Sequence, residues 1–323
     1  MKYVRLGASG LKVSRICLGC MSYGSTQWRP WVLEEGTARP FFQRALDSGI
    51  NMFDTADYYS MGQSEVVTGK ILKDLARRDE IVIATKIGLE MSPNPNGRGL
   101  SRKHISEGID ASLNRLGTDY IDLYQIHRLD RETPMEEICT ALDSAVQKGK
   151  VLYLGASSMW AWEFAKLLGI QKALGLSRFV SMQNHYNLLY REEEREMIPF
   201  CISEGIGVIP WSPMARGVLT RPLAAQATSR SGSDTYTPTL YGATHDPAIL
   251  TALEEAAKGL GKPMAQVALA WVLSRPGVTA PIVGATKLGQ LADAVEAVDI
   301  ALDEETIKAL EASYGPRPVA GIS

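Results

Sequence analysis

Four side chains with useful chemistry stand at or near the ends of short apolar runs. Asp54, Lys86 and His127 each end or directly follow such a run, and Tyr59 comes five residues after Asp54. A phenol beside an ammonium group should have a lowered pKa, because the cation favours the phenolate. Tyr59 would then be a general acid, with Asp54 pairing Lys86 and His127 orienting a substrate oxygen. Together these residues predict carbonyl reduction.

Other interpretations of the same residues are open. Asp54 and Lys86 could form a buried salt bridge without a catalytic role, although such pairs are weak evidence for stability. Tyr58 adjoins Tyr59 and is a second candidate acid. Lys86 could instead be the Schiff-base nucleophile of a lyase barrel. Its expected pairing with Asp54, and the absence of phosphate-site glycines, argue against that alternative.

The strands that hold these side chains in place are predicted from eight apolar runs bounded by turn residues. Continuous apolar runs of this length are typical of parallel strands buried on both faces. The runs are Ile16–Gly19, Asn51–Asp54, Ile81–Thr85, Tyr120–Ile126, Val151–Gly155, Phe179–Met182, Gly207–Pro210 and Ala280–Val283. Because active sites of α/β barrels collect at the carboxyl ends of the strands, the polar residues at these ends are expected to meet.

Amphipathic helical patterns lie between the runs. They include Ile105, Ile109, Leu113 and Leu116, then Ile138, Leu142, Ala145 and Val146, and later Met264, Val267, Ala268, Trp271 and Val272. Strict alternation leaves a closed barrel or an open doubly wound sheet. An open dinucleotide-binding sheet should carry G-x-G-x-x-G after an early strand, and none is present. We therefore predict an α/β fold, a (β/α)₈ TIM barrel.

Segments outside the repeating units complete this prediction. Val4–Leu6 and Lys12–Val13 flank a Gly-rich turn and predict a hairpin that closes the bottom of the barrel. The Ser/Thr/Gly-rich stretch Thr220–His245 is long enough to be functional or mobile, and extra helices are expected in the C-terminal part. No internal repeat or domain boundary is visible, so residues 1–323 are expected to form a single domain.

Composition narrows the possible partners. The 323 residues are 45% hydrophobic and 22% charged, with a net charge of −2, which is typical of a soluble globular protein and gives no electrostatic reason for binding nucleic acid or membrane. No signal peptide or membrane span is predicted, and four cysteines are too few for a disulfide framework, so a cytoplasmic location is expected. Cys17 and Cys20 form a C-x-x-C on a strand, where residues three apart face opposite sides, so no metal site is expected.

The motifs resemble those of the aldo-keto reductase family, in the family's order, from roughly Arg5 to Tyr314. The matching segments are Leu18–Met21, Phe53–Tyr59, Ala84–Lys86, Tyr124–His127, Gly155–Met159 and Trp211–Pro213. The segment Ser181–Tyr190 is most similar to the bacterial and fungal, oxidoreductase-type branch. The resemblance implies that Tyr59, rather than Tyr58, donates the proton. A branch that reduces carbon–carbon double bonds carries an acid where His127 stands, so aldehydes and ketones are expected.

The resemblance also implies NADPH as the cofactor, with NADH a weaker alternative. Ser157, Ser158 (in place of the family's Asn) and Gln183 would hold the nicotinamide carboxamide. Trp211 would stack on the ring, and the long loop that begins at Ser212 would fold over the pyrophosphate. The full set of expected cofactor contacts is Gly19, Cys20, Met21, Asp54, Ser157, Ser158, Gln183, Trp211, Ser212, Pro213, Met214, Arg216, Gly217, Gly284, Thr286, Lys287, Gln290 and Asp293.

The expected 2′-phosphate site is the start of a helix near Leu288. A helix N-terminus with Lys287 beside it is suited to an anion, and Asp293 would contact the adenine amine. The family often has Arg where Gln290 stands and Asn where Ala294 stands. These departures weaken the expectation of a strict preference for NADPH over NADH.

Aromatic residues are expected to form the substrate pocket above the strand ends. They are Trp28, Trp31, Tyr58, Met159 and Trp160, with Tyr186 as a further candidate. Such a pocket favours an aromatic or medium-chain aldehyde or ketone over a free sugar. The protein would act as a monomer or homo-oligomer. A rival function is a cofactor-binding subunit attached to an ion channel, which would usually be tetrameric with an N-terminal extension, whereas here the expected barrel begins almost at Met1.

Overall fold

The computed structural model of this chain describes residues 1–225, 236–241 and 246–322. The stretch Thr220–His245, expected to form a loop over the cofactor, therefore lies largely outside the described residues. Its described parts are residues 220–225 and the short helix α7 (Tyr236–Tyr241). The expectation that this stretch is functional or mobile stays a prediction.

Eight parallel strands form the central sheet of the described chain, in the order β10-β3-β4-β5-β6-β7-β8-β9. Their bounds are β3 (Cys17–Gly19), β4 (Met52–Asp54), β5 (Val82–Ile87), β6 (Ile121–Ile126), β7 (Val151–Ser157), β8 (Phe179–Gln183), β9 (Gly207–Val208) and β10 (Ile282–Val283). The ends of the sheet meet, because Val208 bridges Val278 in parallel and the Ile282 amide donates to the Pro210 carbonyl at 2.8 Å. All eight predicted strands and the (β/α)₈ barrel are confirmed.

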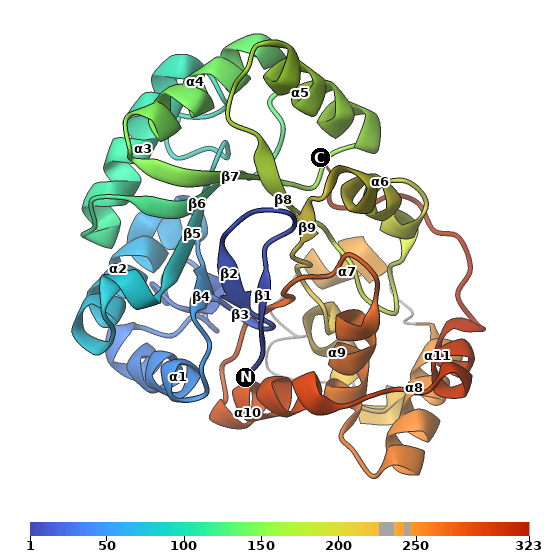
Figure 1. Cartoon of the computed structure of the whole chain (residues 1–323). Coiled ribbons are helices and arrows are strands. Elements are labelled where there is room, and N and C mark those ends of the chain that lie inside the picture. The colour runs from blue at the N-terminus through green and yellow to red at the C-terminus, as the bar shows by residue number, and fades with distance from the viewer. Residues whose placement is uncertain (226–235, 242–245, 323) are drawn as a thin grey trace.

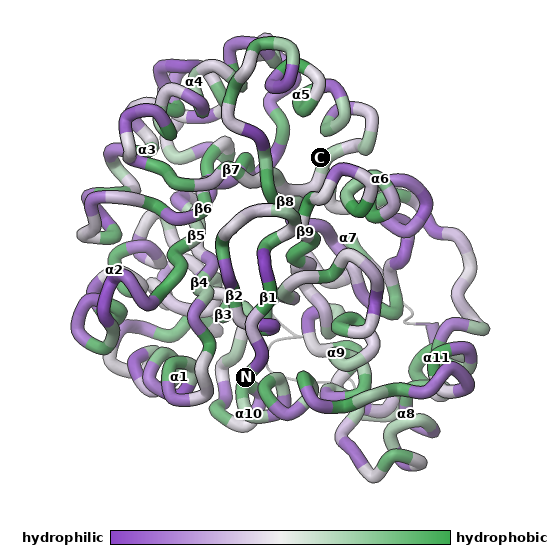
Figure 2. Tube along the Cα trace, in the orientation of Figure 1, coloured by the Kyte–Doolittle hydropathy of each residue, from purple (hydrophilic) through white to green (hydrophobic). Residues whose placement is uncertain are grey.

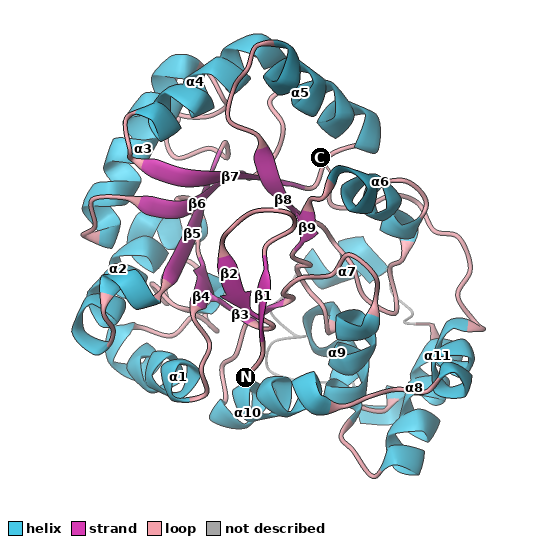
Figure 3. Cartoon of the chain, in the orientation of Figure 1, coloured by secondary structure: helices cyan, strands magenta, loops and turns pink. Residues whose placement is uncertain are grey.

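Helices lie outside the strands and follow them in alternation (Figures 1 and 3). They are α1 (Glu35–Asp47), α2 (Gln63–Leu75), α3 (Arg102–Leu116), α4 (Met135–Gln147), α5 (Ala161–Ala173), α6 (Met197–Glu204), α8 (Pro247–Leu260), α9 (Met264–Ser274), α10 (Leu288–Glu296) and α11 (Glu304–Glu311). The start of α3 shows why the sequence places these boundaries. Ser101 accepts a hydrogen bond from the His104 amide, and Gly117 ends the helix at a φ of 64°.

The predicted N-terminal hairpin covers one end of the barrel (Figure 1). It consists of β1 (Tyr3–Arg5) and β2 (Lys12–Ser14). The turn packs against the start of β9, because the Ala8 amide donates to the Gly205 carbonyl at 2.7 Å. At Gly7 the φ is 57°, and a Cβ would meet that carbonyl oxygen at 2.4 Å, so only glycine fits. The opposite end, where the strands finish, is left for the site.

The core lies inside the barrel and between the sheet and its helices. Figure 2 shows hydrophobic residues along the strands, with hydrophilic ones concentrated on the surrounding helices. Leu6 and Val13 of the hairpin region join inward-facing strand residues such as Met52 and Leu123 in one buried cluster. Cys17 and Cys20 are buried free thiols, and the described residues contain no cluster of His, Cys, Asp and Glu that could hold a metal ion. None of the described helices has the length and hydropathy to cross a membrane.

Candidate active site

The ends of neighbouring strands bring Asp54, Lys86 and His127 together. Strand pairing aligns Gly19 with Asp54 and Lys86 with Gln125, so these residues lie at the same level of the barrel. The His127 amide donates to the Ile87 carbonyl at 2.8 Å and continues the pairing beyond β6. A cavity of about 630 Å³ opens above these strand ends, with Asp54, Tyr59 and His127 in its lining.

Lys86 is the centre of the hydrogen-bond network. Its Nζ atom donates to Asp54 Oδ2 at 2.5 Å, to the Thr55 carbonyl at 2.9 Å and to Tyr59 Oη at 3.2 Å. All three ammonium donors are therefore used. Burial lowers the pKa of Lys86, but the Asp54 carboxylate and the Tyr59 hydroxyl raise it, and the net shift is upward. A fully bonded ammonium is a poor nucleophile, which argues against the Schiff-base alternative.

Asp54 is held by partners on three strands. Besides Lys86, its Oδ1 atom accepts hydrogen bonds from Gln125 Nε2 at 2.9 Å and from Gln183 Nε2 at 3.0 Å. The carboxylate is only 2% exposed. Because every partner is a donor, the network fixes the Asp54 carboxylate in place and directs Lys86 toward Tyr59.

The predicted lowering of the Tyr59 pKa is wrong in this structure. Burial raises the pKa of Tyr59 above its ordinary value of 10.0, and this outweighs Lys86, which lowers it. Desolvation disfavours the phenolate more than one already paired ammonium favours it. Tyr59 is therefore a protonated phenol at neutral pH. Its oxygen accepts from Lys86, which leaves its own proton free to be donated into the cavity.

His127 faces Tyr59, with ring centroids 5.6 Å apart and planes at 89°. Burial holds the pKa of His127 well below 6.5, and the charges of Lys86 and Arg128 lower it further. The imidazole is therefore neutral and carries one N–H. Its Nδ1 atom is buried with no hydrogen-bond partner among the described residues. A neutral imidazole at this position can donate a hydrogen bond to an oxygen bound beside Tyr59 without competing for its proton.

The turn that follows Tyr59 is strained. Ser60 and Met61 both have a φ of 52°, in the left-handed region that non-glycine residues rarely adopt. Ser60 Oγ accepts a hydrogen bond from the Ser25 amide at 3.2 Å, and a Cβ at Gly24 would meet the same oxygen at 2.5 Å. Contacts from the segment around Gly24 thus hold the strained turn, and with it the position of Tyr59.

The expected nicotinamide contacts divide into two groups. Ser157, Gln183 and Trp211 line the cavity. Ser158 does not line it: this buried residue accepts a hydrogen bond from Trp211 Nε1 at 2.9 Å and so orients the indole from behind. Cys20 is also fully buried outside the cavity lining, because it turns into the core behind β3.

Trp211 is backed by a stack of aromatic rings. His185 lies between Trp211 and Tyr190, with ring centroids 4.2 Å from each and interplanar angles of 11° and 14°. His185 Nε2 is 2.7 Å from the Tyr241 hydroxyl, which belongs to α7. Burial lowers the pKa of His185 from 6.5 to about 3, helped by Arg216 and Arg128. The ring is thus neutral, as a stacked and buried histidine must be.

We expect this histidine to make stability depend on pH. Because its folded pKa is about 3 and its ordinary value is 6.5, the unfolded chain binds the proton first as the pH falls. The contribution of His185 to the free energy of unfolding is thus fully present above about pH 6.5. It decreases by ~1.4 kcal/mol per pH unit as the pH falls toward the folded pKa. Urea unfolding of wild type and His185→Phe from neutral to mildly acidic pH checks this. On acidification the unfolding free energy of wild type should fall relative to that of His185→Phe. Parallel curves for the two proteins would refute the prediction.

The far end of the cavity reaches the start of α10. Gly284, Thr286, Lys287, Gln290 and Asp293 all line it there. Gln290 Oε1 accepts hydrogen bonds from the Thr286 and Lys287 amides at 2.9 and 3.1 Å. The expected anion site therefore has two of its amides already bonded to Gln290, while the Lys287 side chain is exposed at the cavity edge.

The cavity fits a dinucleotide in shape and in chemistry. It runs from the strand ends to α10, with amide and hydroxyl groups near Tyr59, a flat indole face and basic residues further along. In the turn after Trp211, Gly217 has a φ of 100°, a backbone conformation that favours glycine. The expected contacts that line the cavity are Gly19, Met21, Asp54, Ser157, Gln183, Trp211, Ser212, Pro213, Met214, Arg216, Gly217, Gly284, Thr286, Lys287, Gln290 and Asp293.

Only part of the expected substrate pocket is found. Trp28 and Tyr58 line the cavity, with ring centroids 6.1 Å apart. Trp31 does not line it, and Met159 is buried in the main core cluster. Tyr186 is buried against Trp271. Loop aromatics can face the core or solvent instead of the site, and the sequence does not indicate which.

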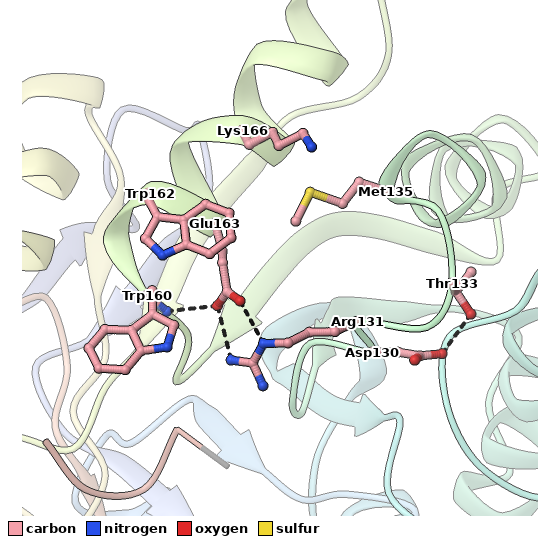
Figure 4. A pocket seen from close by; sticks show the side chains of 8 residues that line it. All are labelled: Asp130, Arg131, Thr133, Met135, Trp160, Trp162, Glu163 and Lys166. Carbon is pink, nitrogen blue, oxygen red and sulfur yellow. Dashed lines mark hydrogen bonds and ion pairs between the residues drawn. The ribbon is translucent and has the colours of Figure 1, made fainter.

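Trp160 also lies away from this cavity. It borders a separate surface pocket with Trp162, and Figure 4 shows both indoles beside the Arg131–Glu163 ion pair, whose Nε–Oε1 distance is 2.7 Å. The Trp160 amide donates to Glu163 at 3.0 Å, so its position is set by the start of α5.

Several residues of the site and of its cavity were not predicted. Gln125, which holds Asp54, could have been found from its polar side chain on a buried strand. Arg128 carries a similar signal, because it is a charged residue directly after His127. Others come from loops without a motif. The additional lining residues include Ser22, Arg29, Leu89, Arg128, Thr220, Arg221, Tyr236, Pro263 and Ala265.

Comparison with known proteins agrees with this geometry. The model of the Aldo/keto reductase family matches residues 15–314. The chain is 48% identical to versiconal hemiacetal acetate reductase of Aspergillus parasiticus, over 99% of this chain and 98% of that protein. It is 45% identical to a putative aryl-alcohol dehydrogenase of Schizosaccharomyces pombe, over 99% and 97% of the two chains. It is 42% identical to an aldo-keto reductase of Fusarium vanettenii, over 99% and 93%.

These relatives and the family match span nearly the whole chain, including every strand that carries a site residue. The resemblance of the motifs to the family is thereby confirmed. The chain belongs to the aldo/keto reductase family and is an NAD(P)-dependent oxidoreductase.

Proposed function

We propose that this protein reduces aldehydes and ketones to alcohols with NADPH, and that Tyr59 is the proton donor. The observation that carries the proposal is the bonding of Lys86 Nζ, which joins Asp54 to the Tyr59 oxygen at 2.5 and 3.2 Å. With that oxygen accepting from Lys86, the phenolic proton is directed to a substrate. Ser157, Gln183 and Trp211 would hold the nicotinamide, whose chemistry would be to supply a hydride for the carbonyl carbon, and the proton from Tyr59 would complete the alcohol.

The chain's own residues account for the movement of the proton. The raised pKa of Tyr59 keeps the phenol protonated before reaction. As negative charge develops on the carbonyl oxygen, Tyr59 donates to it and the neutral His127 stabilises it through a hydrogen bond. Lys86 then stabilises the phenolate at a distance already set for a hydrogen bond. Lys86 thus favours the ionised form of Tyr59 at the stage when the phenol has given up its proton.

The cavity supports an aromatic substrate. Trp28 and Tyr58 are partly exposed beside Tyr59, and the Trp28 and Tyr59 ring centroids are 6.4 Å apart. Aromatic side chains in this arrangement favour a flat apolar ring. The name of the Schizosaccharomyces relative, an aryl-alcohol dehydrogenase, fits the same class, since oxidation of an aryl alcohol gives an aryl carbonyl compound.

A panel of carbonyl compounds tests this function. Purified protein should oxidise NADPH with aromatic aldehydes and release the corresponding alcohols, identified by chromatography. Aliphatic aldehydes, aldoses and conjugated enones serve as comparison substrates. Turnover confined to the enones would contradict carbonyl reduction and indicate reduction of carbon–carbon double bonds. No turnover with any of these compounds would favour a cofactor-binding regulatory role.

Lys287 supports the preference for NADPH. It lines the cavity at the start of α10, and no carboxylate of the described chain forms an ion pair with it. We expect Lys287→Ala to weaken NADPH binding by about 10- to 100-fold, the usual range for a lost charged hydrogen bond, and to change NADH binding little. Quenching of protein fluorescence measures both dissociation constants. Lys308→Ala, on the exposed face of α11, is the matched control; equal losses for the two cofactors would argue against a phosphate contact.

A further inference from the structure

Arg128 is a basic residue of the cavity that the carbonyl chemistry does not use. It follows His127 just after β6, is partly buried, and lines the cavity. Its Nη1 atom donates to the His127 carbonyl at 2.6 Å, and the side chain also hydrogen-bonds to Tyr236. A guanidinium has five N–H donors. Among the described residues these two partners, both without a formal charge, leave most of that capacity unused.

No carboxylate of the described residues forms an ion pair with Arg128. Two other partly buried arginines of this chain do have one: Arg115 Nε lies 2.6 Å from Glu65, and Arg78 Nη2 lies 2.6 Å from Asp122. Arg15 has no carboxylate partner either, but its guanidinium donates to three backbone carbonyls, those of Leu273, Val278 and Thr279. Partial burial lowers the pKa of Arg128, yet a guanidinium remains charged in proteins. Holding such a charge away from water without a counter-ion costs free energy. An anionic ligand in the cavity would compensate that cost.

The charge of Arg128 acts on the reacting groups. It lowers the pKa of both Tyr59 and His127, although burial is the larger influence on each. Arg128 therefore lies within electrostatic reach of the place where the carbonyl would bind. Its neighbours in the lining include Trp28 and Leu89, and Arg29 stacks on Trp28 with its Cζ atom 4.4 Å from the ring centroid.

An anion bound at Arg128 would belong to the substrate rather than the cofactor. The residues suited to the nicotinamide, Ser157, Gln183 and Trp211, come from β7, β8 and the segment after β9. Lys287, at the start of α10, lies toward the other end of the cavity. Arg128 follows β6, directly after His127. A group bound there would be carried by the molecule whose carbonyl Tyr59 protonates.

We propose that the preferred substrates are aromatic aldehydes or ketones that carry a carboxylate, and that Arg128 binds this carboxylate. The inference rests on the proposed carbonyl reduction and adds the substrate class. A guanidinium suits a carboxylate because two parallel N–H groups match its two oxygens. The aromatic side chains bind the ring, Tyr59 and His127 bind the carbonyl oxygen, and Arg128 sets the orientation of the ring between them.

The test compares 4-formylbenzoate with its methyl ester, a neutral compound with the same ring and aldehyde. Wild type should have the higher kcat/KM for the acid. In Arg128→Met, the ratio of kcat/KM for acid over ester should fall by about 10- to 100-fold, the range for a lost charged hydrogen bond. Arg128→Lys should retain part of the ratio, because it keeps the charge but loses the paired geometry. Calorimetric titration of 4-formylbenzoate into the protein with NADP⁺ should show the same order.

Arg131→Met is the matched control, because Arg131 pairs with Glu163 outside this cavity. It should keep the wild-type ratio. An acid-to-ester ratio in Arg128→Met equal to that of wild type would overturn the proposal, as would weaker NADPH binding with an equal loss for both aldehydes. If wild type reduces neutral aldehydes but not the acid, the substrate class fails while carbonyl reduction stands. If it reduces no carbonyl compound at all, the proposed function itself fails.

Discussion

Replacing Tyr59 with phenylalanine should lower kcat for carbonyl reduction by ~10²–10⁴-fold, the usual contribution of a positioned acid. The ring would still fill its place beside His127, whose centroid is 5.6 Å away, so the loss would come from the missing proton. Cofactor binding should change little, because the hydroxyl faces Lys86 and the substrate side. Steady-state rates with an aromatic aldehyde, together with NADPH titration by fluorescence, measure both quantities.

Tyr58 provides the internal control for this experiment. It is the neighbouring tyrosine and also lines the cavity, but no hydrogen bond joins its hydroxyl to Lys86 among the described residues. Tyr58→Phe should have the smaller effect, seen mainly in KM. A larger fall in kcat for Tyr58→Phe than for Tyr59→Phe would assign the acid to Tyr58. Wild-type turnover in Tyr59→Phe would remove the proposed mechanism.

Lys86→Met should reduce both stability and turnover, for separable reasons. The methionine leaves Asp54, which is 2% exposed, without its charged partner. Breaking one side of a buried ion pair typically costs ~3–5 kcal/mol of unfolding free energy. Turnover falls because the phenolate of Tyr59 loses the ammonium that lies 3.2 Å from its oxygen. Chemical denaturation measures the first effect and single-turnover rates the second.

A double variant distinguishes the two roles of Lys86. Asp54→Asn with Lys86→Met removes both charges, so no buried ion remains unpaired, and much of the stability should return. Turnover should stay low, because the stabilising cation is still absent. Recovery of turnover together with stability would show that Lys86 is structural, as a simple buried salt bridge would be. Continued instability with full turnover would contradict both parts of the prediction.

The fold was predictable because its signal is local and repeated. Each of the eight strands is a short apolar run between turn residues, and the start of α3 is signalled by Ser101. The joint position of Asp54, Lys86 and His127 was also accessible, since parallel strands place their carboxyl ends at one face of the barrel. Gln125 belongs to the same class and could have been included, because its polar side chain interrupts a buried strand.

What the sequence by itself determined is therefore the barrel and the set of reactive groups at its strand ends, because periodicity and strand order are properties of the chain. Only the tertiary structure decided that the pKa of Tyr59 rises, because burial and the Lys86 charge oppose each other and their balance depends on packing. Only it placed Met159 and Tyr186 in the core and Trp160 at another pocket. Loop side chains can turn either way, so their direction depends on neighbours that are distant in sequence. The same holds for Arg128. Its position beside His127 is visible in the sequence, but only the fold shows that no described residue gives it an acidic partner.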